Sequence, residues 1–134
     1  MKNHFLLLSI TIIALLTLSS CTGKMIHEAD DGKLFEYAIG STFQIQLKGD
    51  PQEGFMWKTV GVNNSVVLQK GEPVVETPEE TGNDYGTYTF TFETRGAGNE
   101  VLRMIYYDKN AEDPKPEKEF EIRVTSGTMG RIEE

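Results

Sequence analysis

Two residue types that often build catalytic centres are nearly absent from this 134-residue sequence, which has one cysteine and two histidines. The single cysteine, Cys21, cannot form a disulfide within the chain, so core packing must hold the fold. After Cys21 the chain has one histidine, His27, only six residues further on. We do not expect a base in that position to be held with the precision that nucleophilic catalysis requires, and no pair of carboxylates stands out among the acidic residues. We therefore do not expect an enzyme.

Basic residues are also scarce, since 13 Lys and Arg stand against 21 Asp and Glu, for a net charge of −8. A chain this acidic does not wrap nucleic-acid phosphate, and charge alone does not bind it to anionic lipid. The segment from Asp108 has the oxygen ligands of a calcium loop, but Asp113 stands where such a loop needs glycine and Pro114 follows it. We expect no nucleic-acid partner, no metal and no other cofactor.

Long apolar runs are missing except at the N-terminus, where residues 5–18 follow a start that contains Lys2. This run is short for a membrane span, which needs about 20 apolar residues, and is typical of a signal-peptide core. The next residues, Leu18-Ser19-Ser20-Cys21, resemble the lipobox of bacterial lipoproteins, in which a small residue precedes the cysteine that receives a lipid. We predict a signal peptide over 1–20 and lipidation of Cys21.

The lipobox resemblance places the mature protein outside the cytoplasm, anchored by lipid to a membrane of a bacterial cell envelope. Residue 22 is threonine, and the absence of aspartate there resembles lipoproteins sent to an outer membrane, so we expect that membrane if the host has one. The polar, acidic stretch 21–33 is predicted to be the tether, and 126–134 a flexible tail. We expect the mature protein to be a monomer.

Between tether and tail, residues 34–125 repeatedly alternate apolar and polar side chains with the period of two that is typical of strands. Residues 101–107 are apolar on both parities apart from Arg103 and predict a more central strand. Strands are predicted near 34–35 and over 42–48, 55–60, 65–69, 74–76, 87–94, 101–107 and 119–124. No stretch has the 3.6-residue apolar period of an amphipathic helix. Short strands separated by turn-rich segments predict an antiparallel β-sandwich. The sole tryptophan, Trp57, is predicted to anchor its core.

A further turn signal lies in residues 49–57, just before a predicted strand. Pro51 fixes its own φ, and Gly54 permits a positive φ where the strand begins. The two residues predict a stiff, projecting turn. Such a turn can be purely structural, or it can present a binding surface at little entropic cost.

Residues 50–57 resemble the Asn-Pro-Thr-Thr-Gly-Phe/Tyr-x-Trp motif of the chagasin-like inhibitors of papain-type cysteine peptidases. The shared residues are Pro51, Gly54, Phe55 and Trp57, with Asp50 in place of the asparagine and Gln52 and Glu53 in place of the two threonines. The similarity covers most of the mature chain. It includes an early strand over 43–47, an alternating strand between Gly86 and Gly98, and a last strand over 120–124.

The resemblance implies an immunoglobulin-like β-sandwich of six to eight strands that inserts three neighbouring loops into a peptidase active-site cleft. It implies reversible inhibition, with the first loop over the catalytic cysteine and the other two against the flanking walls. The implied peptidase-binding residues are Asp50, Pro51, Gln52, Glu53, Gly54 and Phe55 in the first loop, Asn83, Asp84, Tyr85 and Gly86 in the second, and Asp108, Lys109 and Asn110 in the third. The family has Gly-x-Gly-Gly in the second loop and Arg-Pro-Trp/Phe in the third.

Three other functions remain open from the sequence. The same sandwich could be a non-inhibitory binding module whose loops recognise another envelope protein or a ligand. An inhibitor of another hydrolase, such as lysozyme, would also suit an acidic surface. A catalytic lipoprotein is the least favoured, because His27 lies in the predicted tether.

Overall fold

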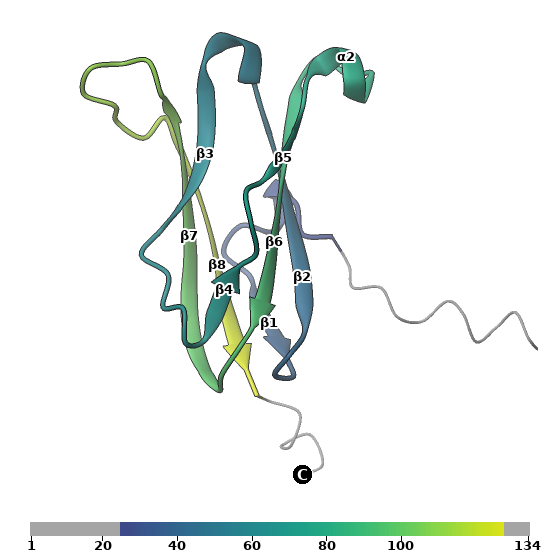
Figure 1. The fold of residues 1–134 in the computed structure, drawn as a ribbon, viewed down its shortest axis with the longest axis vertical. Helices are drawn as coiled ribbons and strands as arrows, with labels where there is room; N and C mark the ends of the chain where they lie inside the picture. The colour runs from purple at the N-terminus through teal and green to yellow at the C-terminus, as the bar shows by residue number, and fades with distance from the viewer. Residues whose placement is uncertain (1–24, 128–134) are drawn as a thin grey trace, which may run out of the picture.

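The computed structural model describes residues 25–127. The predicted signal peptide over 1–20, the predicted lipidation site Cys21 and residues 128–134 of the predicted tail lie outside the described residues. Figure 1 shows two layers of strands packed face to face, which confirms the predicted all-β sandwich. The longest helix in the described part of the chain has four residues, and no helix there has the length or apolar character to span a bilayer.

Eight strands form the two sheets. They are β1 (Leu34–Tyr37), β2 (Thr42–Gly49), β3 (Phe55–Val60), β4 (Val67–Gln69), β5 (Val74–Glu76), β6 (Gly86–Thr94), β7 (Gly98–Asp108) and β8 (Lys118–Ser126). One sheet has the order β1-β8-β7-β3, and the other has the order β2-β6-β4 with β5 also paired to β6. All pairs of strands are antiparallel except β1 with β8, which is parallel.

The period-two pattern produces the core directly, because alternate side chains of a strand point to opposite faces of its sheet. The buried hydrophobic residues of the four longest strands are Phe43, Ile45, Leu47, Tyr88, Phe90, Phe92, Leu102, Met104, Tyr106, Phe120, Ile122 and Val124. Trp57 is 2% exposed and joins the same cluster, as predicted. The outer face of β2 and β6 carries threonine and glutamine instead, such as Gln44 hydrogen-bonded to Thr91.

The segment just before β1 is part of the folded domain. Ile26 is 1% exposed, and its N–H donates to the carbonyl of Gln44 in β2 (3.0 Å). Six residues later, the N–H of Gly32 donates to the carbonyl of Glu121 in β8 (2.7 Å), so the segment links the two sheets. The described residues of the predicted tether, 25–33, are therefore not a free linker. Ile26 is buried in the core, although most of its neighbours in the sequence are polar. The folded domain also includes the first residue of the predicted tail, because Ser126 is the last residue of β8 and is buried.

Three short helical turns interrupt the strands, although none was predicted. They are η1 (Glu28–Asp30), η2 (Pro51–Glu53) and α2 (Pro78–Thr81). At α2 the side chain of Thr77 accepts from the N–H of Glu80 (3.3 Å), and the carboxylate of Glu80 accepts from the N–H of Thr77 (2.8 Å). The sequence contains the residues of this reciprocal cap and a proline in the first turn. A four-residue helix is too short to show an apolar period, so the hydrophobic pattern does not predict it.

Three tyrosines that are wholly or partly buried are expected to make the fold sensitive to alkaline pH. Tyr37 packs against Phe43 with ring centroids 4.7 Å apart, and burial raises the pKa of Tyr37 to about 12. Burial raises the pKa of Tyr88 and of Tyr106 as well. An unfolded tyrosine ionises near pH 10, so the stabilisation is complete below that pH and is lost as the pH rises through the folded pKa.

We expect the free energy of unfolding to fall between pH 9 and pH 12, and to fall less in the variant Tyr37→Phe, which has no phenol to ionise. Urea unfolding at a series of pH values measures both slopes. Equal slopes for the two chains would show that Tyr37 does not contribute.

Candidate functional site

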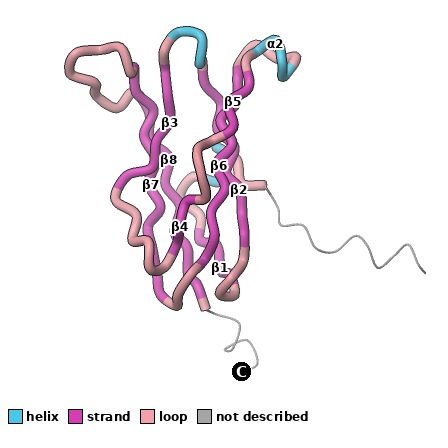
Figure 2. The backbone as a smooth tube through the Cα atoms, viewed as in Figure 1, coloured by secondary structure: helices cyan, strands magenta, loops and turns pink. Residues whose placement is uncertain are grey.

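Three loops meet at one end of the sandwich, at the top of Figures 1 and 2, opposite the end where β8 finishes. The first loop (50–54) joins β2 to β3 and contains η2. The second loop (77–85) joins β5 to β6 and contains α2. The third loop (109–117) joins β7 to β8. This loop end brings together all of the residues named from the sequence as peptidase-binding, in the loops themselves or at the strand ends beside them.

The first loop is a tight turn, as predicted from its proline and glycine. Pro51 starts η2, and the N–H of Gly54 donates to the carbonyl of Pro51 (3.2 Å). Gly54 has φ 91° and ψ 10°, the left-handed conformation that only glycine adopts without strain. This conformation directs the chain from η2 straight into β3 and leaves Gln52 and Glu53 exposed at the tip.

Aromatic residues of the core fix the base of the first loop. The hydroxyl oxygen of Tyr106 accepts from the N–H of Asp50 (2.8 Å), and its ring stacks on that of Phe55 with centroids 5.1 Å apart. The hydroxyl of Tyr88 donates to the carbonyl of Phe55 (2.5 Å). The indole N–H of Trp57 donates to the carbonyl at Lys48 (3.0 Å). The sequence predicts the turn but not the part that Tyr88 and Tyr106 play in holding it. The pattern that could have indicated this part is a tyrosine hydroxyl at an inward strand position where the other residues are apolar.

The second loop leans on the first. Gly86 is buried, and a Cβ on it would collide with the carbonyl oxygen of Glu76 in β5 and would lie 2.7 Å from the Cδ of Pro51, so only glycine permits both approaches. The side-chain amide of Gln52 donates to the carboxylate of Glu79 in α2 (3.3 Å). Tyr85, half-buried, lies under the ammonium group of Lys48, which is 4.5 Å from the ring centroid. These contacts hold α2 beside the tip of the first loop.

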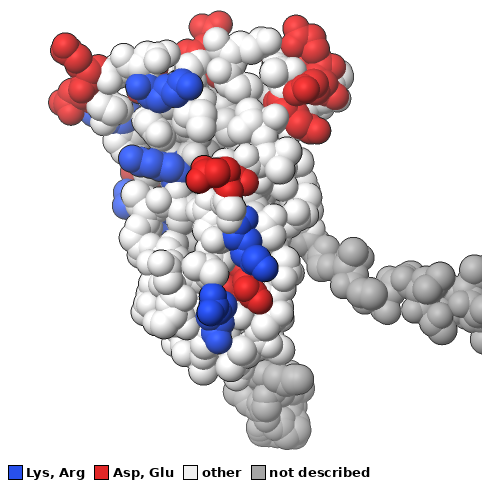
Figure 3. Space-filling model, viewed as in Figure 1, with Lys and Arg blue, Asp and Glu red and all other residues white. Residues whose placement is uncertain are grey.

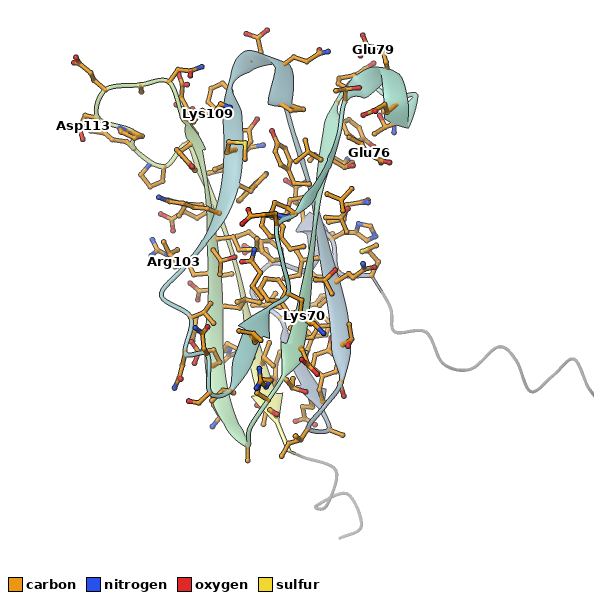
Figure 4. The ribbon with its side chains drawn as sticks, viewed as in Figure 1. Lys70, Glu76, Glu79, Arg103, Lys109 and Asp113 are labelled. Carbon is orange, nitrogen blue, oxygen red and sulfur yellow. The ribbon has the colours of Figure 1, made fainter. Side chains whose placement is uncertain are left out.

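The third loop is attached to the first at its near end only. The N–H of Lys109 donates to the carbonyl of Gly54 (3.0 Å), and the side-chain amide of Asn110 occupies the space where a Cβ on Gly54 would lie. The carboxylate of Asp108 accepts from the N–H of Asn110 (2.9 Å) and shapes this turn. Beyond it the loop is exposed, and Figure 4 shows Asp113 at its outer edge, further from the first loop than Lys109.

The named residues therefore divide into two groups. Gly54, Gly86 and Phe55 support the loops from below, and the first two are buried. The exposed residues that could touch a partner are Asp50, Gln52, Glu53, Asn83, Asp84, Lys109 and Asn110, and the half-buried Pro51, Tyr85 and Asp108 lie beside them. The sequence pattern gave all of them one role, because it cannot distinguish a residue that shapes a loop from one that the loop presents.

Negative charge is concentrated at the loop end. The three loops hold eight carboxylates against two lysines, Lys109 and Lys115. Figure 3 shows acidic side chains at all three loops and mixed charges on the visible face below them. The carboxylates are Asp50, Glu53, Glu79, Glu80, Asp84, Glu112, Asp113 and Glu117. Among residues 25–127, no group of three or more Asp, Glu, His or Cys side chains is placed to hold a metal ion.

The hydroxyl of Tyr106 offers a direct test of how the first loop is held. Tyr106→Phe removes the acceptor of the Asp50 N–H and should lower the free energy of unfolding by about 1 kcal/mol. Exchange of the Asp50 amide hydrogen, followed by NMR, should become faster. Tyr107→Phe is the matched control, because its half-buried ring lies under Lys58 (4.8 Å) on the other face of the sheet. Similar exchange in both variants would contradict the role given to Tyr106.

Comparison with known proteins agrees with this architecture. The sequence profile described as "Chagasin family peptidase inhibitor I42" matches residues 36–124. The fold is similar to the crystal structure of the cysteine protease inhibitor EhICP2 from Entamoeba histolytica, with a TM-score of 0.65 and 13% identity over 76% of this chain and 93% of that chain. It is also similar to the solution structure of amebosin, with a TM-score of 0.58 and 19% identity over 78% of this chain and 99% of that chain. Among curated protein sequences, none matches.

Proposed function

The chain belongs to the chagasin family of peptidase inhibitors, and from this premise we propose that it blocks papain-type cysteine peptidases by inserting its three loops into the active-site cleft. The family is one of inhibitors, not of enzymes. In the proposed complex no bond forms or breaks, so inhibition is reversible and affinity is set by contacts alone.

The observation that supports this proposal most is the mutual support of the three loops. The first loop is fixed at its base by Tyr106, on one side by the second loop through Gly86, and on the other by the third loop through Lys109 and Asn110. A loop that is already in its bound shape loses little conformational entropy on binding. The loop end is therefore suited to entering a cleft as one preformed wedge.

Each loop has a distinct task in the proposed complex. Gln52 and Glu53, at the exposed tip of the first loop, would lie over the catalytic cysteine. Asn83 and Asp84 would contact one wall of the cleft, and Lys109 with Asn110 the other. Exclusion of substrate follows from occupation of the cleft, and it requires no reactive group on the inhibitor.

The charge of the tip determines how well it suits a cysteine peptidase. Papain-type enzymes carry a thiolate paired with a histidine, and a carboxylate beside that thiolate is repelled once water is displaced. Glu53→Thr removes this carboxylate, so binding should tighten by about tenfold, which corresponds to about 1.4 kcal/mol. The control is Glu112→Thr, which removes the same charge from the exposed part of the third loop and should change affinity little.

Alkylation of the catalytic cysteine measures where the inhibitor sits. Saturating inhibitor should slow the reaction of papain with iodoacetamide, and Glu53→Thr should give the same protection at a lower concentration. Alkylation at an unchanged rate in a complex that still forms would place the inhibitor outside the cleft and contradict the proposal.

A second function follows from the third loop. Asp108, Lys109 and Asn110 stand where the family has an arginine and an aromatic residue, and this difference favours a binding module that does not inhibit peptidases. Its loops would recognise another envelope protein. The two functions are separated by the alkylation experiment, since a binding module of this kind leaves papain unprotected at every concentration.

We also propose that lipid on Cys21 anchors the inhibitor outside the cytoplasm, at a membrane of the cell envelope. The support is the order of basic start, apolar run and lipobox in residues 1–21. In this position the inhibitor would shield the cell from peptidases that reach its surface or envelope. Loss of labelled palmitate from the variant Cys21→Ala tests the anchor, and equal incorporation in both chains would contradict it.

A further inference from the structure

The chain becomes part of the fold very soon after the proposed lipid anchor. Ile26 is 1% exposed and is held to β2 by two backbone hydrogen bonds, one to Gln44 and one from Gln46. Ile26 is the fifth residue after Cys21, and a fully extended chain covers at most about 3.6 Å per residue. The Cα of Ile26 is therefore within about 18 Å of the lipidated residue, whatever path the intervening chain takes.

The direction of the chain at Ile26 shows which end of the sandwich is near the anchor. Ile26 pairs with Ile45 in parallel, so the chain here runs in the same direction as β2. β2 runs from the turn at 38–41 to Gly49 at the loop end. Met25 therefore leads into Ile26 from the side of the opposite end, which we call the anchor end. It consists of the turns at 38–41 and 95–97 and the last residues of β8, at the bottom of Figure 2.

Three of the five large aliphatic side chains that are exposed in the described residues lie in the half of the domain near the anchor end, and the other two, Val74 and Val75, lie on β5 of the other sheet. Ile39, in the turn before β2, is 54% exposed. Leu34 and Val101 are 50% and 47% exposed, and both pair with Arg123 of β8 from either side. Leu34, Arg123 and Val101 thus form one row across the sheet, and together with Asn99, Glu100 and Thr125 they line a shallow hollow of about 350 Å³. Aliphatic groups around a cation suit the boundary between lipid acyl chains and phosphate headgroups.

Charge favours the same orientation. The three loops hold eight carboxylates and two lysines, whereas the other residues in 25–127 hold eleven carboxylates against eight basic side chains. An anionic lipid surface repels the loop end much more strongly than the remainder of the domain. Repulsion at one end and a lipid anchor near the other both direct the loops away from the membrane.

We infer that the domain rests on the phospholipid surface through Ile39 and the row Leu34–Arg123–Val101, with its three loops directed outward. The inference rests on the lipidation of Cys21 given under the proposed function. Three aliphatic side chains do not hold a free domain on a bilayer, but the lipid keeps them at a high effective concentration beside it. The orientation leaves the loop end open to peptidases that arrive from solution.

The sequence offers a clean test, because lipidation blocks Cys21 and leaves no other thiol. A bimane label is placed on Ile39→Cys or on Glu53→Cys, and each lipidated chain is inserted into vesicles of phosphatidylethanolamine and phosphatidylglycerol. Phospholipids brominated near the headgroup should quench the label at position 39 and leave the label at position 53 unchanged. Val101→Asp in the Ile39→Cys chain should reduce the quenching.

Three results would overturn the inference. Equal quenching at both positions would show a domain with no fixed orientation, and no quenching at position 39 would show that the anchor end stays away from lipid. A lipid-free chain starting at Thr22 that dimerises in sedimentation, and that Ile39→Asp makes monomeric, would assign the surface to a second copy. Inhibition of papain is assayed separately with the lipid-free chain, so a failure of the proposed function is distinguishable from a failure of the orientation.

Discussion

Replacing Gly54 by valine is expected to weaken inhibition of a papain-type peptidase by about 100-fold, which corresponds to about 2.7 kcal/mol. Gly54 has φ 91°, a conformation that a β-branched residue resists. Its new side chain would also displace Asn110, whose amide occupies the same space. The first loop and the near end of the third loop should therefore lose their shape together, and the loss should lie mainly in the dissociation rate.

Gly61→Val is the matched control for this experiment. Gly61 has φ 66° at the turn after β3, away from the loop end, and nothing lies within 4 Å of where its Cβ would be. Both variants should lose stability through backbone strain of about 1–3 kcal/mol, and only Gly54→Val should lose inhibition. Inhibition constants and urea unfolding curves measure the two effects, and an equal change of inhibition in both variants would contradict the role of the first loop.

Replacing Trp57 by alanine is expected to lower the free energy of unfolding by about 3–5 kcal/mol. The side chain is 2% exposed, its ring lies 5.0 Å from that of Tyr106, and its N–H holds the carbonyl at Lys48. The loss combines a large cavity with an unsatisfied carbonyl beside the first loop. Trp57→Phe, which refills part of the cavity, should lose less.

Chemical denaturation of both tryptophan variants by urea, followed by circular dichroism, gives the comparison. A change near zero for Trp57→Ala would show that the side chain does not anchor the core. Trp57 would then also not be one of the groups that hold the base of the first loop.

The parts of the fold that the sequence predicts are those with a period. β2, β6 and β8 alternate over six or more residues, so their positions and inward faces follow from the pattern alone. The sequence predicts β7 as a strand too, but residues 101–107 are apolar on both faces apart from Arg103, so the pattern does not show which face is buried. Ile26 and α2 do not follow from it. An isolated isoleucine in a polar stretch and a four-residue helix are fixed by contacts with distant strands, and such contacts leave no local pattern.

In the candidate site, too, the sequence predicts the features that depend on neighbouring residues and not those that depend on distant contacts. Pro51 and Gly54 predict a turn because their backbone preferences are local, and the family resemblance supplied the other loop positions. The role of Gly86, which lets Pro51 approach, and of the Tyr106 hydroxyl, which accepts from Asp50, depends on pairs of residues far apart in the chain. Only the folded arrangement reveals that the loops support one another.

Titration of papain and of a cathepsin L-like peptidase with the lipid-free chain starting at Thr22 tests the central claim most directly. The account predicts reversible inhibition that is competitive with a small peptide substrate and is weakened about 100-fold by Gly54→Val. Full peptidase activity at micromolar inhibitor, with no inhibition gained in Glu53→Thr, would contradict it and leave the binding module as the function of the three loops.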